Sequence, residues 1–148
     1  MKIEKVDHIS FAVRDLEATK KIYREDLGLE PAYEYIAPLE KIKVARYLIG
    51  EVGVEYMEST EPDGEVAKFI EAKGEGFFLI SYKVDNLANA MEELKAKNIK
   101  LIDNKPREIF GAKYAFIHHP DKLSGVLTEL IEGDFDINPH ARGGRNER

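Results

Sequence analysis

The sequence predicts an α+β fold in which two βαβββ modules form a cupped mixed sheet. Three observations predict it. Segments that alternate apolar and polar residues at every second position are interleaved with segments of helical periodicity. A strand-helix stretch near the start of the chain recurs near residue 80. Each copy is followed by three further strand candidates, and this order is typical of two curled sheets joined edge to edge.

The first module is expected over residues 1–60. Residues 5–13 alternate as a strand does. Asp15 is a suitable N-cap for a helix that ends at Gly28. Its predicted apolar stripe consists of Leu16, Ile22, Tyr23 and Leu27. Three strands are then expected near 29–36, 42–49 and 52–58, with a tight turn at Gly50.

A linking helix is predicted over residues 63–74, with Asp63 as its cap. The second module is expected over 75–132. It starts with an apolar strand over 77–84 and continues with a helix capped by Asn86. Its later strands are expected near 99–102, 113–119 and 124–131. Residues 133–148 form a polar tail, which we expect to lie outside the single domain.

The internal repeat pairs residues of the two modules. The stretch Ile9–Leu16 matches Ile80–Leu87, and Val54–Met57 matches Thr128–Ile131. His8 therefore corresponds to Leu79, and Glu55 corresponds to Glu129. We expect these four positions to converge on one site.

The composition narrows the classes of partner. A formal charge of -6 argues against a nucleic-acid partner, because a phosphate backbone requires a basic face. The 148 residues contain no cysteine, which excludes disulfides and thiolate metal sites. No apolar run approaches the roughly 20 residues of a membrane span, so a cytoplasmic protein that does not bind membranes is expected.

The candidate metal ligands are His8, Glu55 and Glu129, because imidazole nitrogen and carboxylate oxygen suit a divalent cation such as Co, Mn, Ni, Zn or Mg. The alternative for His8 is a hydrogen-bonded structural role, and for Glu55 a solvated strand face. Glu129 interrupts an apolar strand and requires a partner if it faces inward. The adjacent pair His118 and His119 is a weaker candidate, because neighbouring strand residues point to opposite faces.

Several stretches resemble the vicinal oxygen chelate (glyoxalase/bleomycin resistance/dioxygenase) superfamily, and most of all the methylmalonyl-CoA epimerases within it. The stretches are Val6–Ile9, Ala12–Leu16, Tyr23–Leu29, Val66–Gly76, Leu101–Asp103, Lys105–Arg107, His119–Pro120 and Gly125–Leu130. Together they span about residues 4 to 132. The resemblance implies a glyoxalase-like fold, a homodimer and a divalent metal held by His8, Glu55 and Glu129.

The sequence departs from that family at two positions. The second histidine ligand of the family is expected where Leu79 stands. The family's acid/base glutamate follows a proline, and here Pro38 is followed by Leu39 and then Glu40. The carboxylate is therefore displaced by one residue.

Two functions follow from these residues. The first is a metal-dependent isomerase or lyase that removes a proton next to a carbonyl, with Glu129 and Glu40 as the catalytic residues and a small-molecule substrate, for which the resemblance suggests an acyl-CoA. The second is a metal-free protein of the small-ligand-binding or resistance type on the same fold. The apolar run Phe77–Leu79 favours the second.

Overall fold

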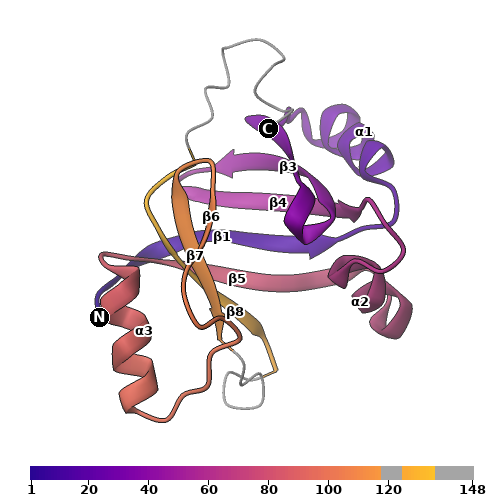
Figure 1. Cartoon of the computed structure of the whole chain (residues 1–148). Coiled ribbons are helices and arrows are strands. Elements are labelled where there is room, and N and C mark those ends of the chain that lie inside the picture. Colours follow the sequence, from indigo (N-terminus) through magenta and orange to yellow (C-terminus); the bar gives the residue numbers. More distant parts are fainter. Residues whose placement is uncertain (118–124, 136–148) are drawn as a thin grey trace. The chain divides into compact units, whose positions relative to one another are not determined.

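The computed structural model describes residues 1–117 and 125–135, which form eight strands and three α-helices (Figure 1). The strands are β1 (Ile3–Ala12), β2 (Tyr33–Ala37), β3 (Ile42–Ile49), β4 (Val52–Ser59), β5 (Gly76–Val84), β6 (Arg107–Ile109), β7 (Ala112–Ile117) and β8 (Leu127–Glu132). The helices are α1 (Leu16–Leu27), α2 (Glu65–Lys73) and α3 (Leu87–Ala96), with a short 3-10 helix, η1, at Pro38–Glu40. The predicted glyoxalase-like α+β fold is confirmed.

The sheet is mixed, with the strand order β2-β3-β4-β1-β5-β8-β7-β6. β5 and β8 run parallel, whereas β2-β3, β3-β4, β6-β7 and β7-β8 are antiparallel neighbours. The chain divides into two compact units. In the part of the chain that the structure describes, we call residues 9–78 the Glu55 unit, and residues 1–8 together with 79–117 and 125–135 the Glu129 unit.

In the Glu55 unit, α1 begins at the predicted cap, where the Asp15 carboxylate accepts a hydrogen bond from the Ala18 N–H at 3.1 Å. It ends at Gly28, whose φ of 68° lies in the left-handed region that glycine adopts at little cost. The core under α1 contains Val13, Leu16, Ala45 and Tyr47. The predicted stripe is wrong at Ile22 and Leu27, which are 55% and 57% exposed.

In the Glu129 unit, α3 begins at the predicted cap Asn86, whose side chain accepts from the Asn89 N–H at 2.9 Å. All four of its predicted inward residues are buried: Leu87, Ala90, Met91 and Leu94. They pack on Ala115, Ile117 and Leu130 of β7 and β8. Helical periodicity was therefore a reliable guide here, because this helix buries one complete face.

Two other predictions at the local level are wrong. Asp63 does not cap α2; its carboxylate binds Lys41 Nζ at 2.7 Å, and Gly64 takes the N-cap position. The strand expected near 99–102 is reduced to one bridge between Leu101 and Ile117. A short strand, β6, pairs with β7 instead, next to an Asp103 carboxylate that accepts from the Phe116 N–H at 2.9 Å.

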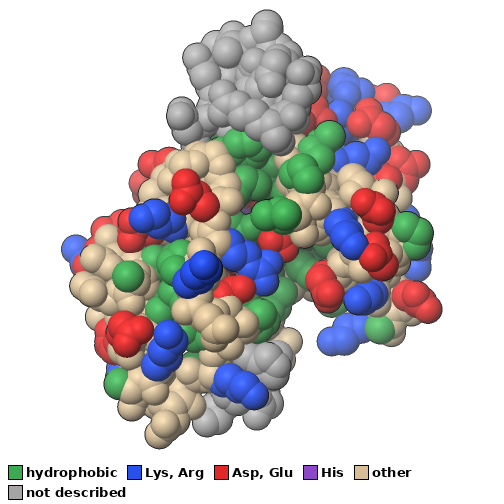
Figure 2. Space-filling view, viewed as in Figure 1, with side chains coloured by type: hydrophobic (Ala, Val, Ile, Leu, Met, Phe, Trp, Pro, Cys, Tyr) green, Lys and Arg blue, Asp and Glu red, His purple; other side chains and the backbone are tan. Residues whose placement is uncertain are grey.

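The surface in view carries basic and acidic side chains interspersed with one another (Figure 2). None of the helices within the described residues is long and apolar enough to cross a membrane.

Candidate active site

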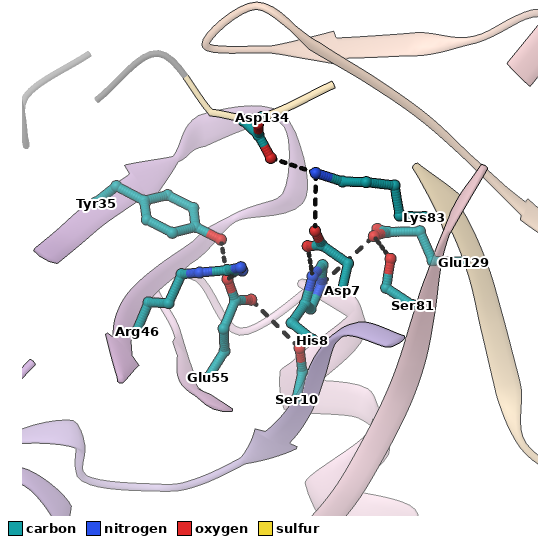
Figure 3. A network of polar contacts seen from close by, with 10 residues as sticks. All are labelled: Asp7, His8, Ser10, Tyr35, Arg46, Glu55, Ser81, Lys83, Glu129 and Asp134. Atoms are coloured by element: carbon teal, nitrogen blue, oxygen red, sulfur yellow. Dashed lines mark hydrogen bonds and ion pairs between the residues drawn. The ribbon is translucent and has the colours of Figure 1, made fainter. Parts of the chain in front are cut away.

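A buried polar cluster in the Glu129 unit surrounds the carboxylate of Glu129, which is 6% exposed (Figure 3). Ser81 Oγ donates a hydrogen bond to Glu129 Oε1 at 2.6 Å. His8 Nε2 lies 3.4 Å from the same oxygen. The strands explain the grouping, because Ser81 of β5 and Glu129 of β8 are register partners in a parallel pair.

The His8 ring is oriented from its other side. Its Nδ1 lies 2.7 Å from Asp7 Oδ2, an arrangement in which an Nδ1–H donates to the ionised carboxylate, and its Nε2 faces Glu129. Asp7 is held in turn by Lys83, whose Nζ lies 3.7 Å from Asp7 Oδ1 and also contacts Asp134. The imidazole therefore lies between two buried carboxylates, with a lysine fixing one of them.

A second buried cluster lies in the Glu55 unit, around a glutamate that is 2% exposed. Ser10 Oγ donates to Glu55 Oε1 at 3.3 Å. Tyr35 OH and Arg46 Nη1 donate to Glu55 Oε2 at 3.1 and 2.9 Å. Burial and the Glu55 carboxylate raise the pKa of Tyr35 well above its usual value, so the phenol remains a neutral donor.

Gly53 provides the space for the Arg46 side chain. A Cβ atom at residue 53 would lie 2.4 Å from Arg46 Cζ and 2.6 Å from Nη2. The guanidinium therefore lies directly against the glycine backbone in β4. Because Arg46 is the register partner of Glu55, the antiparallel pairing of β3 and β4 places the ion pair on one face of the sheet.

Of the other predicted site residues, Glu40 and Leu79 lie within the part of the chain that the structure describes. Glu40 ends η1 and is half-buried. Leu79 is buried, at 5% exposure, and His118 and His119 lie outside the described residues. Within residues 1–117 and 125–135, no group of three or more histidine, aspartate or glutamate side chains is placed to hold a metal ion. The shared metal site at His8, Glu55 and Glu129 stays a prediction.

Sequence reasoning missed four polar partners: Ser10, Tyr35, Arg46 and Ser81. Three of them had a signal. Ser10 and Ser81 recur at matching positions of the internal repeat. Arg46 also had one, because a two-residue turn at 50–51 pairs residue 46 with residue 55 across the hairpin. Tyr35 had none, because the offset of β2 relative to β3 depends on the intervening η1.

Comparisons with known proteins identify the family and several relatives of this chain. A family model described as Glyoxalase/Bleomycin resistance protein/Dioxygenase superfamily matches residues 7–116. The chain is 33% identical over 131 residues to the uncharacterized protein YqjC of Bacillus subtilis, which covers 88% of this chain and 93% of that protein. It is 27% identical to the mitochondrial methylmalonyl-CoA epimerase of Mus musculus over 87% of this chain and 73% of the relative.

Solved structures of methylmalonyl-CoA epimerases have a similar fold. A variant of Streptomyces coelicolor methylmalonyl-CoA epimerase in complex with 2-nitronate-propionyl-CoA superimposes with a TM-score of 0.83 and 27% identity, covering 89% of this chain and 96% of that chain.

Proposed function

Because the chain belongs to the Glyoxalase/Bleomycin resistance protein/Dioxygenase superfamily, we propose that it is an isomerase-type enzyme that removes a proton next to a thioester carbonyl. The substrate class we propose is a 2-substituted malonyl-CoA. Relatives named as methylmalonyl-CoA epimerases and the acyl-CoA complex of one of them support this choice. We further propose a cytoplasmic homodimer, which light scattering of the purified protein would test.

The observation that carries the proposal is the carboxylate of Glu129, buried and aligned by Ser81 at 2.6 Å. A carboxylate held in one orientation away from water is suited to general-base catalysis. His8 lies beside it, with its ring fixed by Asp7. A fixed base next to an oriented imidazole is suited to taking a proton from carbon and holding it.

The proposed reaction is a proton transfer in two steps. Glu129 takes the proton from the carbon next to the carbonyl, and the electron pair of the broken C–H bond moves toward the carbonyl oxygen to give an enolate. A second carboxyl group returns a proton to the opposite face of that carbon. Glu40 is the candidate that the sequence supplies for this second role. The carbon is inverted, and no atom is lost from the substrate.

The test is deuterium exchange. Methylmalonyl-CoA incubated with the protein in deuterated water should gain one deuterium at the carbon next to the carbonyl, as measured by mass spectrometry. Glu129→Gln should lower the exchange rate by about 100-fold or more, because a general base typically contributes that much. Absence of exchange above the uncatalysed rate with both methylmalonyl-CoA and ethylmalonyl-CoA would overturn the proposal.

Glu132→Gln is the matched control. This glutamate lies three residues further along β8, and its carboxylate accepts from the Leu87 N–H at 2.7 Å at the start of α3. Its described hydrogen bond is to the start of a helix, whereas Glu129 accepts from Ser81 and lies beside His8. The control should leave exchange within about threefold of wild type, since a side-chain hydrogen bond of this kind contributes to folding rather than to chemistry.

One observation favours the metal-free binding function as a second candidate. Leu79 is buried on β5, where the family resemblance implies a histidine. The two phenylalanine rings that precede Leu79 in the sequence pack on other rings. Phe77 packs on Phe11 and Phe78 packs on Phe69, with centroids 5.7 and 5.1 Å apart. Stabilisation by small apolar ligands in a thermal-shift screen, without deuterium exchange, would favour this function.

A further inference from the structure

Most of the lone pairs of the Glu55 carboxylate are already used by hydrogen-bond donors of the protein. A carboxylate has about four lone-pair sites. At least three of those on Glu55 accept hydrogen bonds, from Ser10, Tyr35 and Arg46. One of these donors is a cation that is itself 8% exposed, so the charge of Glu55 is already compensated by a fixed partner.

A metal ion bound to Glu55 would also lie close to a second positive charge, the Arg46 guanidinium. A metal ion lies about 2.1 Å from a carboxylate oxygen ligand. Arg46 Nη1 lies 2.9 Å from Glu55 Oε2. An ion bound to that oxygen would therefore be within about 5 Å of the guanidinium nitrogen, in a site shielded from water, where repulsion between like charges is strong.

The position of the Arg46 side chain is fixed by the pairing of β3 and β4. It is held by its register pairing with Glu55 and by the space that Gly53 leaves. Moving it away to admit a metal ion would leave a buried guanidinium without its carboxylate. Leaving a buried charge uncompensated is strongly destabilising.

We propose that Arg46 takes the place of a divalent cation at Glu55, so that the chain binds no metal ion through this glutamate and its chemistry is metal-independent. The first part stands on the Glu55 cluster alone. The second part rests on the proposed function. The two can fail separately, because metal binding is measured without reference to activity.

The test is a titration of metal-free protein with Co²⁺, followed by calorimetry and by the visible absorption of the protein-bound ion. Three proteins are compared: wild type, Arg46→Gln and Arg24→Gln. The Arg46 change removes the cation beside Glu55. Glutamine keeps one hydrogen-bond donor near the carboxylate.

Arg46→Gln should bind Co²⁺ at least about 10-fold more tightly than wild type, since removing a fixed cation next to a buried carboxylate removes a strong repulsion. Arg24→Gln is the matched control for loss of one positive charge: Arg24 pairs with Glu30 on the exposed face of α1, and this variant should behave as wild type does. Equal Co²⁺ affinities of Arg46→Gln and wild type would count against the proposal.

Wild-type protein alone decides the question if Arg46→Gln does not fold. One equivalent of tightly bound Co²⁺ that is lost in Glu55→Gln would overturn the proposal. Retention of deuterium exchange after exhaustive chelation would support its second part. Loss of exchange on chelation, with full recovery on adding Co²⁺, would overturn that part and leave the proposed function intact.

Discussion

The two units of this chain contain the same contact with different surroundings. In each, a serine of the first strand of its repeat donates to a buried glutamate of the last strand: Ser10 to Glu55 and Ser81 to Glu129. Each also anchors a helix start on a later glutamate, Glu58 for α1 and Glu132 for α3. The duplicated unit thus preserved its scaffold.

The residues opposite the glutamates differ. Arg46 is the register partner of Glu55, whereas Phe116 is the register partner of Glu129. One glutamate pairs with a guanidinium and accepts a hydrogen bond from a neutral phenol; the other faces an imidazole. The first carboxylate has a fixed counter-ion, and the second is the one that we propose as the base. Four sets of substitutions test this comparison, from the loss of the buried ion pair to the loss of a helix cap.

Arg46→Met should be the most destabilising change. It leaves the buried Glu55 carboxylate without its cation, and breaking a buried pair in this way costs about 3–5 kcal/mol of the free energy of unfolding. The counterpart substitution Phe116→Leu exchanges one apolar side chain for another and should cost about 1.5 kcal/mol or less. Urea denaturation measures both. Equal costs would mean that the two glutamates do not differ in the way described.

Gly53→Ala should destabilise the Glu55 unit by about 1–3 kcal/mol, because the new methyl group would overlap the Arg46 guanidinium. The repeat places Leu127 at the corresponding position of the other unit, so this tight packing belongs to the arginine-containing unit alone. The cost should shrink by at least about 0.5 kcal/mol when it is measured in an Arg46→Met background. Additive costs would contradict a direct contact.

Ser81→Ala should cost more than Ser10→Ala. The Ser81–Glu129 bond is 2.6 Å long and the Ser10–Glu55 bond is 3.3 Å long. Glu55 also keeps two other donors. A hydrogen bond to a charged group contributes about 1.5–3 kcal/mol, and we expect Ser81 near the upper value and Ser10 at or below the lower one. The reverse order, in the same denaturation assay, would contradict the comparison.

Asp15→Ala and Asn86→Ala should have the smallest effects, and these should be equal. Each side chain caps one helix through a single hydrogen bond, of 3.1 Å for Asp15 and 2.9 Å for Asn86. Loss of such a cap costs about 1 kcal/mol. A shared scaffold predicts matching changes in melting temperature. A difference larger than the cap energy itself would mean that the helices are anchored differently.

The scaffold was predictable from the sequence because it depends on short-range signals. Alternation, caps and a recurring strand-helix stretch located β1, α1, β5 and α3, and the repeat paired Glu55 with Glu129. The short strand β6 was missed, since its three residues offer too few positions for alternation to show. Asp63 failed as a cap because a lysine 22 residues away offered its carboxylate a stronger partner.

The surroundings of the site were less predictable. A buried histidine is compatible with metal ligation or with a structural hydrogen bond, and only coordinates show that its Nδ1 lies 2.7 Å from Asp7 Oδ2. The arginine next to Glu55 depends on the register of one hairpin. A shift of a single residue would have turned Arg46 to the other face.

The division of β1 between the two units has a consequence for the order of folding during synthesis. The Glu55 unit draws on a continuous stretch, Ile9–Phe78, for all of its described residues. The Glu129 unit instead combines the first eight residues with a segment that begins at Leu79. As the chain leaves the ribosome, the Glu55 unit is complete first, while Asp7 and His8 must wait for β8 to emerge before Glu129 can join them.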